Sequence, residues 1–453
     1  MNRLLRINLW HIETILLGCA TLLIGIHFYH LSYLFPDKAG MNGGIFTIWA
    51  SCAIIGKLLL QWRLPVRDRW LFSGVMFLVG WGLVILARLT PILAIRQTLW
   101  LILGFCALLI VALSPIPLRW FNKFSWWVAG GGVILLLTTF IIGVHPSLPL
   151  GAPTLWLSLN RLFIQPSEWL KFVLVGCFAI QIAQHRWQNI LFLWGMVICL
   201  FMLQRDFGVA TLFMAVLFQL AYLARVHYRI LGVALIFSLI LAMIGFFALP
   251  IIRLRVAIWV NPWVDVSGVS YQLVQSLFAF ADGGLFGRGF GFGDPALIPL
   301  AHSDFIFSAI AEEWGLVGIA VMMTSLGCIT WRAMRIGSGQ KTEMGRFFAW
   351  GIGIMHISQN MMIMGGALRI FPLTGMPLTF VSYGGSSLVI SMIMVGMLLR
   401  LSADADLTPQ PPLQTGEGEK IIIYPRLRIK WHWRGILVML GMIFCVAFYW
   451  AVV

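Results

Sequence analysis

Apolar runs long enough to cross a lipid bilayer recur along almost the whole chain. About 18–25 residues of helix match the hydrocarbon thickness of a membrane. Lipid offers no hydrogen bonds to the edge of an open strand, so each run must fold as a helix. We therefore expect an all-α, polytopic integral membrane protein with about thirteen membrane helices. The runs lie at 10–34, 43–62, 70–89, 94–116, 121–144, 167–184, 189–204, 207–224, 230–250, 305–331, 347–367, 379–400 and 434–453.

The composition agrees with a membrane protein. The chain is 60% hydrophobic and 10% charged, with a mean hydropathy of +0.93, and the core of a soluble protein could not absorb so much apolar surface. The net charge of +15 does not indicate nucleic acid, because the basic residues fall in short clusters between apolar runs. The seven cysteines lie inside apolar runs without a CxxC pair, and the nine histidines are scattered. This pattern favours structural thiols over disulfides or a metal site.

The Lys and Arg clusters predict the orientation, because basic loops stay on the cytoplasmic side. The basic segment Met1–Asn8 precedes an apolar run without a small-residue cleavage site, which indicates an uncleaved anchor and a cytoplasmic N-terminus. Basic clusters then recur in alternate loops up to the polar segment 402–433. The loops at 145–166, 251–304 and 368–379 are therefore expected together on the outer face, where they would form one composite site.

Asp304 is the first candidate for chemistry. It stands where a polar, glycine-rich segment meets an apolar helix that also carries Glu312 and Glu313, in a chain with only 16 acidic residues. A carboxylate at the mouth of a membrane span is costly to desolvate and indicates a functional site. The alternative is that Asp304 only caps its helix. About 12–13 Å of helix separates Asp304 from the glutamates, so it would act alone as a general base.

Other candidates each have a structural alternative. Glu168 and Lys171 are spaced to pair on one helix face, as a purely structural ion pair or as part of a site. The run Gly287–Gly293 is typical of a phosphate-binding loop that presents Arg288, or of a close-packed loop at the interface. Ser386 and Ser387 open a helix behind two glycines, which suits an anion or simple capping. The cations available on the outer side are Arg253, Arg255, Arg288 and Arg369.

From about Trp70 to Leu401 the chain resembles the SEDS family of cell-wall proteins, the RodA/FtsW group. No single motif carries the resemblance, but their order along the chain is very specific. The motifs are Gly151-Ala152 with Trp156; Gln165-Pro166-Ser167-Glu168 with Lys171; Gln204-Arg205-Asp206-Phe207-Gly208; Asn261-Pro262-Trp263; Tyr271-Gln272 with Gln275-Ser276; Gly283-Gly284-Leu285-Phe286-Gly287-Arg288-Gly289; Asp304-Phe305-Ile306-Phe307 with Glu312-Glu313-Trp314-Gly315; and Pro372-Leu373-Thr374-Gly375-Met376-Pro377-Leu378 with Ser382 to Ser387.

The resemblance implies a SEDS-type core of about ten helices over residues 67–401, preceded by two extra helices in residues 1–66. A cytoplasmic linker (402–433) and a C-terminal transmembrane helix (434–453) would follow it. That last helix is either a peripheral addition or similar to the anchor of a class B penicillin-binding protein. The family's catalytic aspartate corresponds to Asp304, its head-group aromatic to Trp156, and its ion pair to Glu168 with Lys171. In the motif that ends in Asp206, Arg205 stands where the family usually has proline.

The function implied is a peptidoglycan glycosyltransferase in the bacterial cytoplasmic membrane. It would polymerise lipid II into glycan strands at the outer face, with inversion. Asp304 would be the general base, and the substrate-binding residues would be Trp156, Arg255, Gln272, Arg288, Ser386 and Ser387. Arginines or a divalent cation, Mg²⁺ or Mn²⁺, would neutralise the departing undecaprenyl diphosphate. The partner implied is a class B penicillin-binding protein.

Two other functions stay open. One is a lipid II flippase, because polytopic helices with buried ion pairs also suit transport. The other is a scaffold without catalysis that recruits a transpeptidase.

Overall fold

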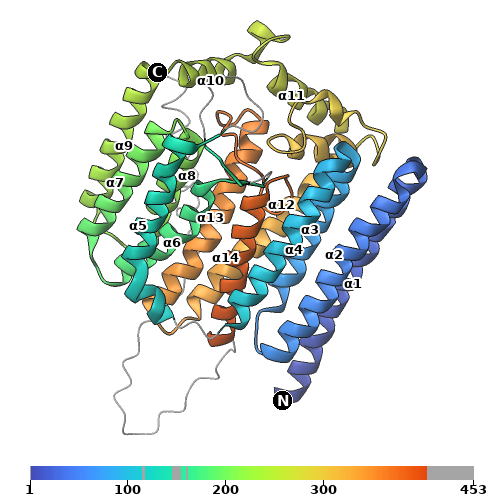
Figure 1. The fold of residues 1–453 in the computed structure, drawn as a ribbon, viewed down its shortest axis with the longest axis horizontal. Helices are drawn as coiled ribbons and strands as arrows, with labels where there is room; N and C mark the ends of the chain where they lie inside the picture. The colour runs from blue at the N-terminus through green and yellow to red at the C-terminus, as the bar shows by residue number, and fades with distance from the viewer. Residues whose placement is uncertain (1, 115–117, 145–154, 160–161, 406–453) are drawn as a thin grey trace.

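The computed structural model describes residues 2–114, 118–144, 155–159 and 162–405. The chain forms a bundle of helices that run up and down between two faces (Figure 1). The helices are α1 (Asn2–Leu34), α2 (Ala39–Arg63), α3 (Arg69–Leu89), α4 (Pro91–Leu113), α5 (Leu118–Ile142), α6 (Pro166–Ala183), α7 (Trp187–Leu203), α8 (Phe207–Leu223), α9 (Tyr228–Ala248), α10 (Pro250–Val260), α11 (Tyr271–Gly283), α12 (Ile306–Ser338), α13 (Glu343–Ala367) and α14 (Gly385–Asp404).

The expected apolar runs from 10–34 to 379–400 fall on α1–α9 and α12–α14. Eight helices of the described residues are long and apolar enough to cross a membrane, and α7 and α8 are shorter apolar helices. The chain is therefore a multi-pass membrane protein. The expected final helix, 434–453, and most of the expected linker, 402–433, lie outside the described residues.

One face of the bundle holds the segments 143–144, 155–159, 162–165, 204–206, 249–305 and 368–384 and is called the loop face here; it is at the top of Figure 1. The prediction that 145–166, 251–304 and 368–379 share one face is confirmed for their described residues. The segment 251–304 is more ordered than the expected loop. It contains α10, α11 and the short 3₁₀ helices η2 (Pro262–Asp265) and η3 (Pro295–Leu297). Figure 1 shows α10 lying across the ends of the membrane helices.

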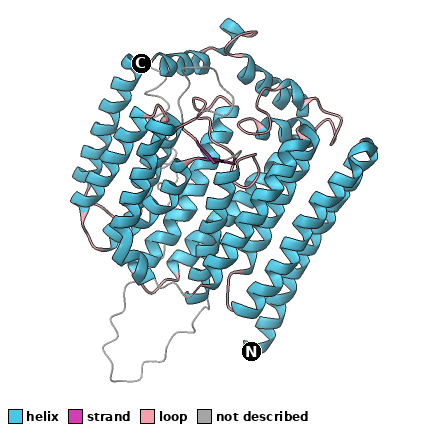
Figure 2. Ribbon diagram, in the orientation of Figure 1, coloured by secondary structure: helices cyan, strands magenta, loops and turns pink. Residues whose placement is uncertain are grey.

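A short hairpin departs from the expected all-helical chain. Strands β1 (Leu157–Leu159) and β2 (Leu162–Ile164) pair antiparallel on the loop face (Figure 2). An isolated bridge joins Val144 to Trp156 beside them. The strands lie outside the apolar runs and on the loop face, so their unpaired outer edges need not face the hydrocarbon of the membrane.

Three successive helix ends share one geometry. His185, Arg205 and Arg225 follow α6, α7 and α8 with φ of 54°, 61° and 54°. The next residue's amide reaches back to the last turn in each case, as Asp206 N does to Phe201 O at 2.9 Å. This is the left-handed helix terminus that usually takes glycine. Proline cannot adopt a positive φ, so the turn at Arg205 requires a residue other than proline.

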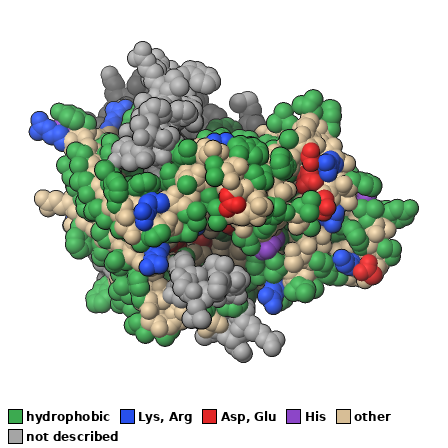
Figure 3. Space-filling model, turned by 90° about the horizontal axis from the view of Figure 1, so that it is seen from above, with side chains coloured by type: hydrophobic (Ala, Val, Ile, Leu, Met, Phe, Trp, Pro, Cys, Tyr) green, Lys and Arg blue, Asp and Glu red, His purple; other side chains and the backbone are tan. Residues whose placement is uncertain are grey.

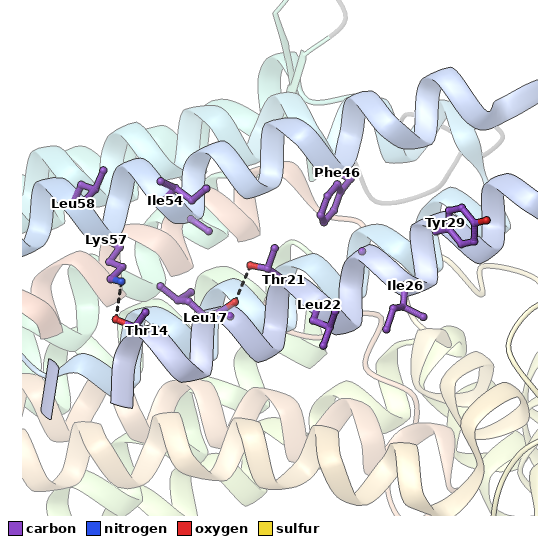
Figure 4. Close-up of a pocket in the computed structure, with 13 residues that line it drawn as sticks. Thr14, Leu17, Thr21, Leu22, Ile26, Tyr29, Phe46, Ile54, Lys57 and Leu58 are labelled. Atoms are coloured by element: carbon purple, nitrogen blue, oxygen red, sulfur yellow. Dashed lines mark hydrogen bonds between the residues drawn. The ribbon is translucent and has the colours of Figure 1, made fainter. Parts of the chain in front are cut away.

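The helices α4, α6, α13 and α14 pack together at the centre of the bundle, and α1 and α2 lie to one side against α3 (Figure 1). A groove of about 750 Å³ runs between α1 and α2 (Figure 4). Apolar side chains such as Leu17, Leu22 and Phe46 line it, and Lys57 donates to Thr14 Oγ1 at one end. The groove lies among apolar spans, away from the polar motifs, so it is not a candidate active site.

Charged contacts fix the end of the bundle opposite the loop face. Arg67 donates to Glu13 Oε1 at 2.7 Å, which ties α1 to the α2–α3 connection. Asp68 caps α3 by accepting from Trp70 N and Leu71 N, and its other oxygen accepts from Arg332 Nε of α12 at 2.6 Å. The Asp68 side chain is fully buried and that of Arg332 is 12% exposed. Asp68 therefore stabilises two helices at once.

We expect Asp68→Asn to lower the thermal stability of the purified protein in detergent, and Asp68→Ala to lower it further. Asparagine can still cap α3 but leaves Arg332 without its counter-charge, which typically costs about 3 kcal/mol or more for a buried pair. Alanine also removes the cap, for about 1 kcal/mol more. The exposed Asp37→Asn is the control. Unfolding temperatures of both Asp68 variants equal to that of the wild type would contradict the assignment.

Candidate functional site

The loop 372–384, between α13 and α14, lies at the centre of the loop face and is largely buried. It has no regular structure, so side chains must satisfy its backbone. Gln359 Nε2 donates to Pro377 O at 2.8 Å, and Asn360 Oδ1 accepts from Thr379 N at 2.9 Å. Gly208 of α8 approaches so closely that a Cβ there would meet Thr374 O at 2.4 Å. Helices α8 and α13 thus hold this loop in one conformation.

The same loop holds the turn that carries Asp304. Ser382 Oγ donates to Ser303 O at 2.6 Å, and Tyr383 N donates to His302 O at 2.9 Å. From α4, Gln97 Nε2 donates to Ser382 O and Gln97 Oε1 accepts from Gly384 N, both at 3.3 Å. The backbone on the N-terminal side of Asp304 is therefore fixed by segments far away in the sequence.

Asp304 is not the cap of α12. The helix begins at Ile306 with Phe305 in the N-cap position, and no side chain makes a capping hydrogen bond there. The explanation of Asp304 as a capping residue is therefore wrong. Its side chain is partly accessible on the loop face. A carboxylate that is held in place without a capping role is available for chemistry.

Arg255 of α10 faces the same space as Asp304. Its Nη1 donates to Leu373 O at 3.2 Å. A Cβ built on Gly375 would lie 3.8 Å from Arg255 Nη2 and 3.9 Å from Asp304 Oδ2. Gly375 has a φ of 69°, in the left-handed region that favours glycine. Asp304 and Arg255 therefore border one small space, which glycine leaves open.

Burial raises the pKa of the Asp304 carboxyl to about 6, against the opposing influence of a hydrogen bond from Ser303 and the charge of Arg255. A carboxyl with this pKa is mostly ionised at neutral pH and is a stronger base than an ordinary aspartate. Such a group is suited to accept a proton from a substrate hydroxyl.

A second set of charges lies behind the loop 372–384. Lys171 Nζ of α6 lies 2.6 Å from Glu168 Oε1 and donates to Gln359 Oε1 at 3.0 Å. Glu168 and Lys171 make the contact that their spacing predicts, and both are 2% exposed. Since Gln359 also binds Pro377 O, the ion pair is connected directly to the loop.

Asp206 is a site residue that the sequence alone did not single out. It caps α8 by accepting from Val209 N at 3.3 Å. Burial raises its pKa to about 6, while that amide and the charges of Lys171 and Arg255 act in the opposite direction. The available signal was an aspartate in a polar motif just before an apolar helix.

Arg288 lies in a different cluster. It bonds Asp282 at 2.8 Å and lies 3.8 Å from Glu312 Oε1. Glu312 also accepts from Asp294 N at 2.7 Å, and Glu313 lies 3.7 Å from Arg88 Nε of α3. Carboxylates therefore already compensate the charge of Arg288, although its side chain is 45% exposed. It is less available to an anion than Arg255.

The other predicted residues are spread around the loop face. Trp156 is half-buried beside the β-hairpin, and Gln272 is half-buried in the first turn of α11. Ser386 and Ser387 are buried in the first turn of α14. Arg369, one of the four arginines predicted on the outer side, donates from Nε to Trp259 O at 2.8 Å. It thereby satisfies a carbonyl at the C-terminal end of α10.

The loop face is hollowed near its centre (Figure 3). Acidic side chains show at the floor of the hollow, and lysine, arginine and histidine side chains lie around it (Figure 3). Among the described residues there is no group of three His, Cys, Asp or Glu side chains that could hold a metal ion. The described part of the chain therefore holds no cluster of three side chains that could bind a divalent cation without the substrate.

Residues 68–406 match the FtsW/RodA/SpoVE family, which is described as a cell cycle protein family. The peptidoglycan glycosyltransferase RodA of Mycobacterium tuberculosis strain H37Rv is 29% identical over 79% of this chain and 81% of its own length. The probable peptidoglycan glycosyltransferase FtsW of Trichlorobacter lovleyi is 32% identical over 77% of this chain and 96% of its own length. The probable peptidoglycan glycosyltransferase FtsW of Halothiobacillus neapolitanus is 30% identical over 75% of this chain and 86% of its own length.

Solved structures agree with these relatives. One, from work on the structural coordination of polymerization and crosslinking by a peptidoglycan synthase complex, has a TM-score of 0.64 at 27% identity. It covers 75% of this chain and 98% of the other. The crystal structure of RodA from Thermus thermophilus, 23% identical with a TM-score of 0.55 and the same coverage, shows the fold alone. The chain thus belongs to the FtsW/RodA/SpoVE family of multi-pass membrane proteins and is a peptidoglycan glycosyltransferase.

Proposed function

We propose that this glycosyltransferase polymerises lipid II, and that its loop face lies outside the bacterial cytoplasmic membrane with the N-terminus in the cytoplasm. The observation that carries the proposal is Asp304, a carboxylate on the loop face that does not cap its helix and has a pKa raised to about 6. The orientation rests on two basic clusters, Arg3 with Arg6 and the segment Arg63 to Arg69. Both lie at the end of the bundle opposite the loop face, where α1 and α3 begin and α2 ends.

Asp304 is the general base of the proposed reaction. Its carboxylate takes the proton of the GlcNAc 4-hydroxyl of one lipid II molecule. The oxygen forms a bond to the MurNAc anomeric carbon of the growing chain, and the bond from that carbon to undecaprenyl diphosphate breaks. Attack opposite to the leaving group inverts the anomeric configuration. The space between Asp304 and Arg255, which Gly375 leaves open, is where the two reacting groups would meet.

Arg255 is the cation best placed to stabilise the departing diphosphate. Its guanidinium donates one hydrogen bond to a backbone carbonyl, and no carboxylate of the described residues forms an ion pair with it. Arg288 and Arg369 are both engaged elsewhere. A charge fixed near the leaving group lowers the barrier because it needs no reorganisation. The proposed mechanism assigns no step to a protein-bound cation, because the donor set does not fit one.

The proposed partner is a class B penicillin-binding protein. Support comes from the similar solved structure of a peptidoglycan synthase complex, in which polymerization and crosslinking are coordinated. A transpeptidase beside the polymerase would receive the new strand on the same side of the membrane.

Purified Asp304→Asn protein, given labelled lipid II in detergent, should make almost no glycan. The amide keeps the size of the side chain but cannot accept the proton, and loss of a general base typically lowers the rate by about 10²–10⁴. Asp265→Asn, an exposed aspartate on the same face, is the matched control. Detergent removes the two sides of a membrane, so polymer formed by the wild type also excludes a pure transporter. Polymer from a folded Asp304→Asn variant at the wild-type rate would refute the role of Asp304.

The polymerisation rate should rise with pH and reach half of its plateau near pH 6. Below that pH Asp304 is protonated and cannot act as a base, and above it the carboxylate is free. Asp206 has a pKa in the same range, so the profile must also be measured for Asp206→Asn. The rising limb should persist in that variant, even if the plateau is lower. Its disappearance would assign the titration to Asp206 instead.

Arg255→Gln should reduce the plateau rate and move the rising limb to higher pH. The charge of Arg255 lowers the pKa of Asp304. Without that charge, the effect of burial is less opposed and the pKa of Asp304 rises further. Arg253→Gln, an exposed neighbour on α10, is the control and should change neither quantity. A lower plateau with an unmoved limb would mean that Arg255 serves the leaving group without affecting the base.

A further inference from the structure

Helix α12 is broken at Gly315, nine residues after it begins. Gly315 has a φ of 62° inside an otherwise helical segment. The break separates a short upper part, 306–314, from a long lower part, 316–338. Asp304 lies two residues before the upper part. The orientation of the upper part therefore determines where the carboxylate of Asp304 lies.

The glycine-rich loop 283–291 takes the place of the missing helical hydrogen bonds. Leu316 N donates to Gly284 O at 3.0 Å, and Val317 N donates to Leu285 O at 3.2 Å. In return, Arg288 N donates to Glu312 O at 2.8 Å, and Gly289 N donates to Glu313 O at 3.1 Å. These carbonyls and amides would bond each other in a continuous helix. The loop is thus inserted into the break and fixes its angle.

The additional helix α1 holds the residue next to the break. Trp314 Nε1 of α12 donates to His27 Nε2 of α1 at 3.3 Å. His27 Nδ1 lies 2.7 Å from Leu23 O, which can only accept, so Nδ1 carries the proton and Nε2 is free to accept. Both ring nitrogens of a neutral His27 are thereby used. This hydrogen bond crosses from a segment outside the family match to a segment inside it.

The same helix also packs on the inserted loop. The Phe290 ring stacks on Trp314 with centroids 4.9 Å apart and meets His27 edge-on at 5.0 Å. A Cβ on Gly291, whose φ is 86°, would lie 2.6 Å from Leu34 Cδ1. The upper end of α1 therefore packs against the loop 283–291 where this loop is inserted into the break.

We propose that His27 is a positioning residue for the glycosyl transfer: through Trp314 and the inserted loop, α1 sets the angle of the upper part of α12 and hence the place of Asp304. This inference rests on the proposed role of Asp304. It assigns a catalytic purpose to helix α1, which precedes the family match at residue 68. His27 contacts no substrate in this proposal and acts only through Trp314.

The test combines kinetics with amide hydrogen exchange on the full-length protein. His27→Ala should lower kcat about three- to tenfold with little change in KM, the size expected for one lost hydrogen bond expressed in the transition state. Trp314→Phe, which removes only the donor and keeps an aromatic ring, should have a similar effect. The double variant should be no worse than either single variant, because both remove the same bond. His27→Gln, which retains an acceptor, should recover most of the rate.

Hydrogen exchange makes the test independent of the chemistry. In His27→Ala, the amides of 284–289, Leu316 and Val317 should exchange faster, while those of the rest of the lower part of α12, 318–338, should not change. Tyr33→Ala, an exposed position on the same helix, should leave exchange and kcat as in the wild type. Unchanged exchange in His27→Ala would overturn the proposal, as would faster exchange with an unchanged kcat. If the wild type made no glycan from lipid II, the proposed function would fail, and the exchange result would still decide whether α1 holds the break.

Discussion

One side-chain amide connects the interior charges of this protein to its candidate active site. Gln359 accepts from Lys171 and donates to Pro377 O. The loop around Pro377 has no regular structure, and its residues 376 and 378–382 are buried, so side chains must satisfy part of its backbone. Its conformation therefore depends on a few fixed polar side chains, of which Gln359, Asn360 and Gln97 contribute most. This loop also holds the turn of Asp304, so the position of this carboxylate follows from the same bonds.

The membrane helices could be predicted from the sequence because each needs only a long apolar run. The helices on the loop face could not be predicted in this way. α11 is amphipathic and buries Leu273, Val274 and Ala279 on one side, but it is short and surrounded by glycine and proline. Without an apolar run, its sequence is typical of a loop. The β-hairpin escapes prediction for a similar reason, since its strands have three residues each.

Asp304 could be proposed from the sequence because a carboxylate at the mouth of a membrane span is costly to desolvate, which indicates a functional site. The difference between Arg255 and Arg288 could not be found. Both are arginines in polar segments, but Arg288 meets Asp282 and Glu312 only because the glycine-rich loop folds back onto α12. Asp206 belongs to a motif that the sequence displays, yet its nearness to Lys171 and Arg255 depends on how α6, α8 and α10 are arranged.

The break in α12 and the charges around it have one physical origin. A glycine that interrupts a membrane helix exposes carbonyls and amides, and lipid cannot bind them. The loop 283–291 binds them instead, and Glu312 and Glu313 then need cations, which Arg288 and Arg88 provide. The ion pairs on the described part of the loop face thus use Glu168, Asp282, Glu312 and Glu313 for structure. Asp304 forms no ion pair with any described residue, and because its charge is costly to hold in partly buried surroundings, its pKa is raised to about 6. Asp206 likewise forms no ion pair among the described residues and has a pKa of about 6. Asp304 differs from it because its carboxylate is partly accessible and borders the space that Gly375 leaves open beside Arg255.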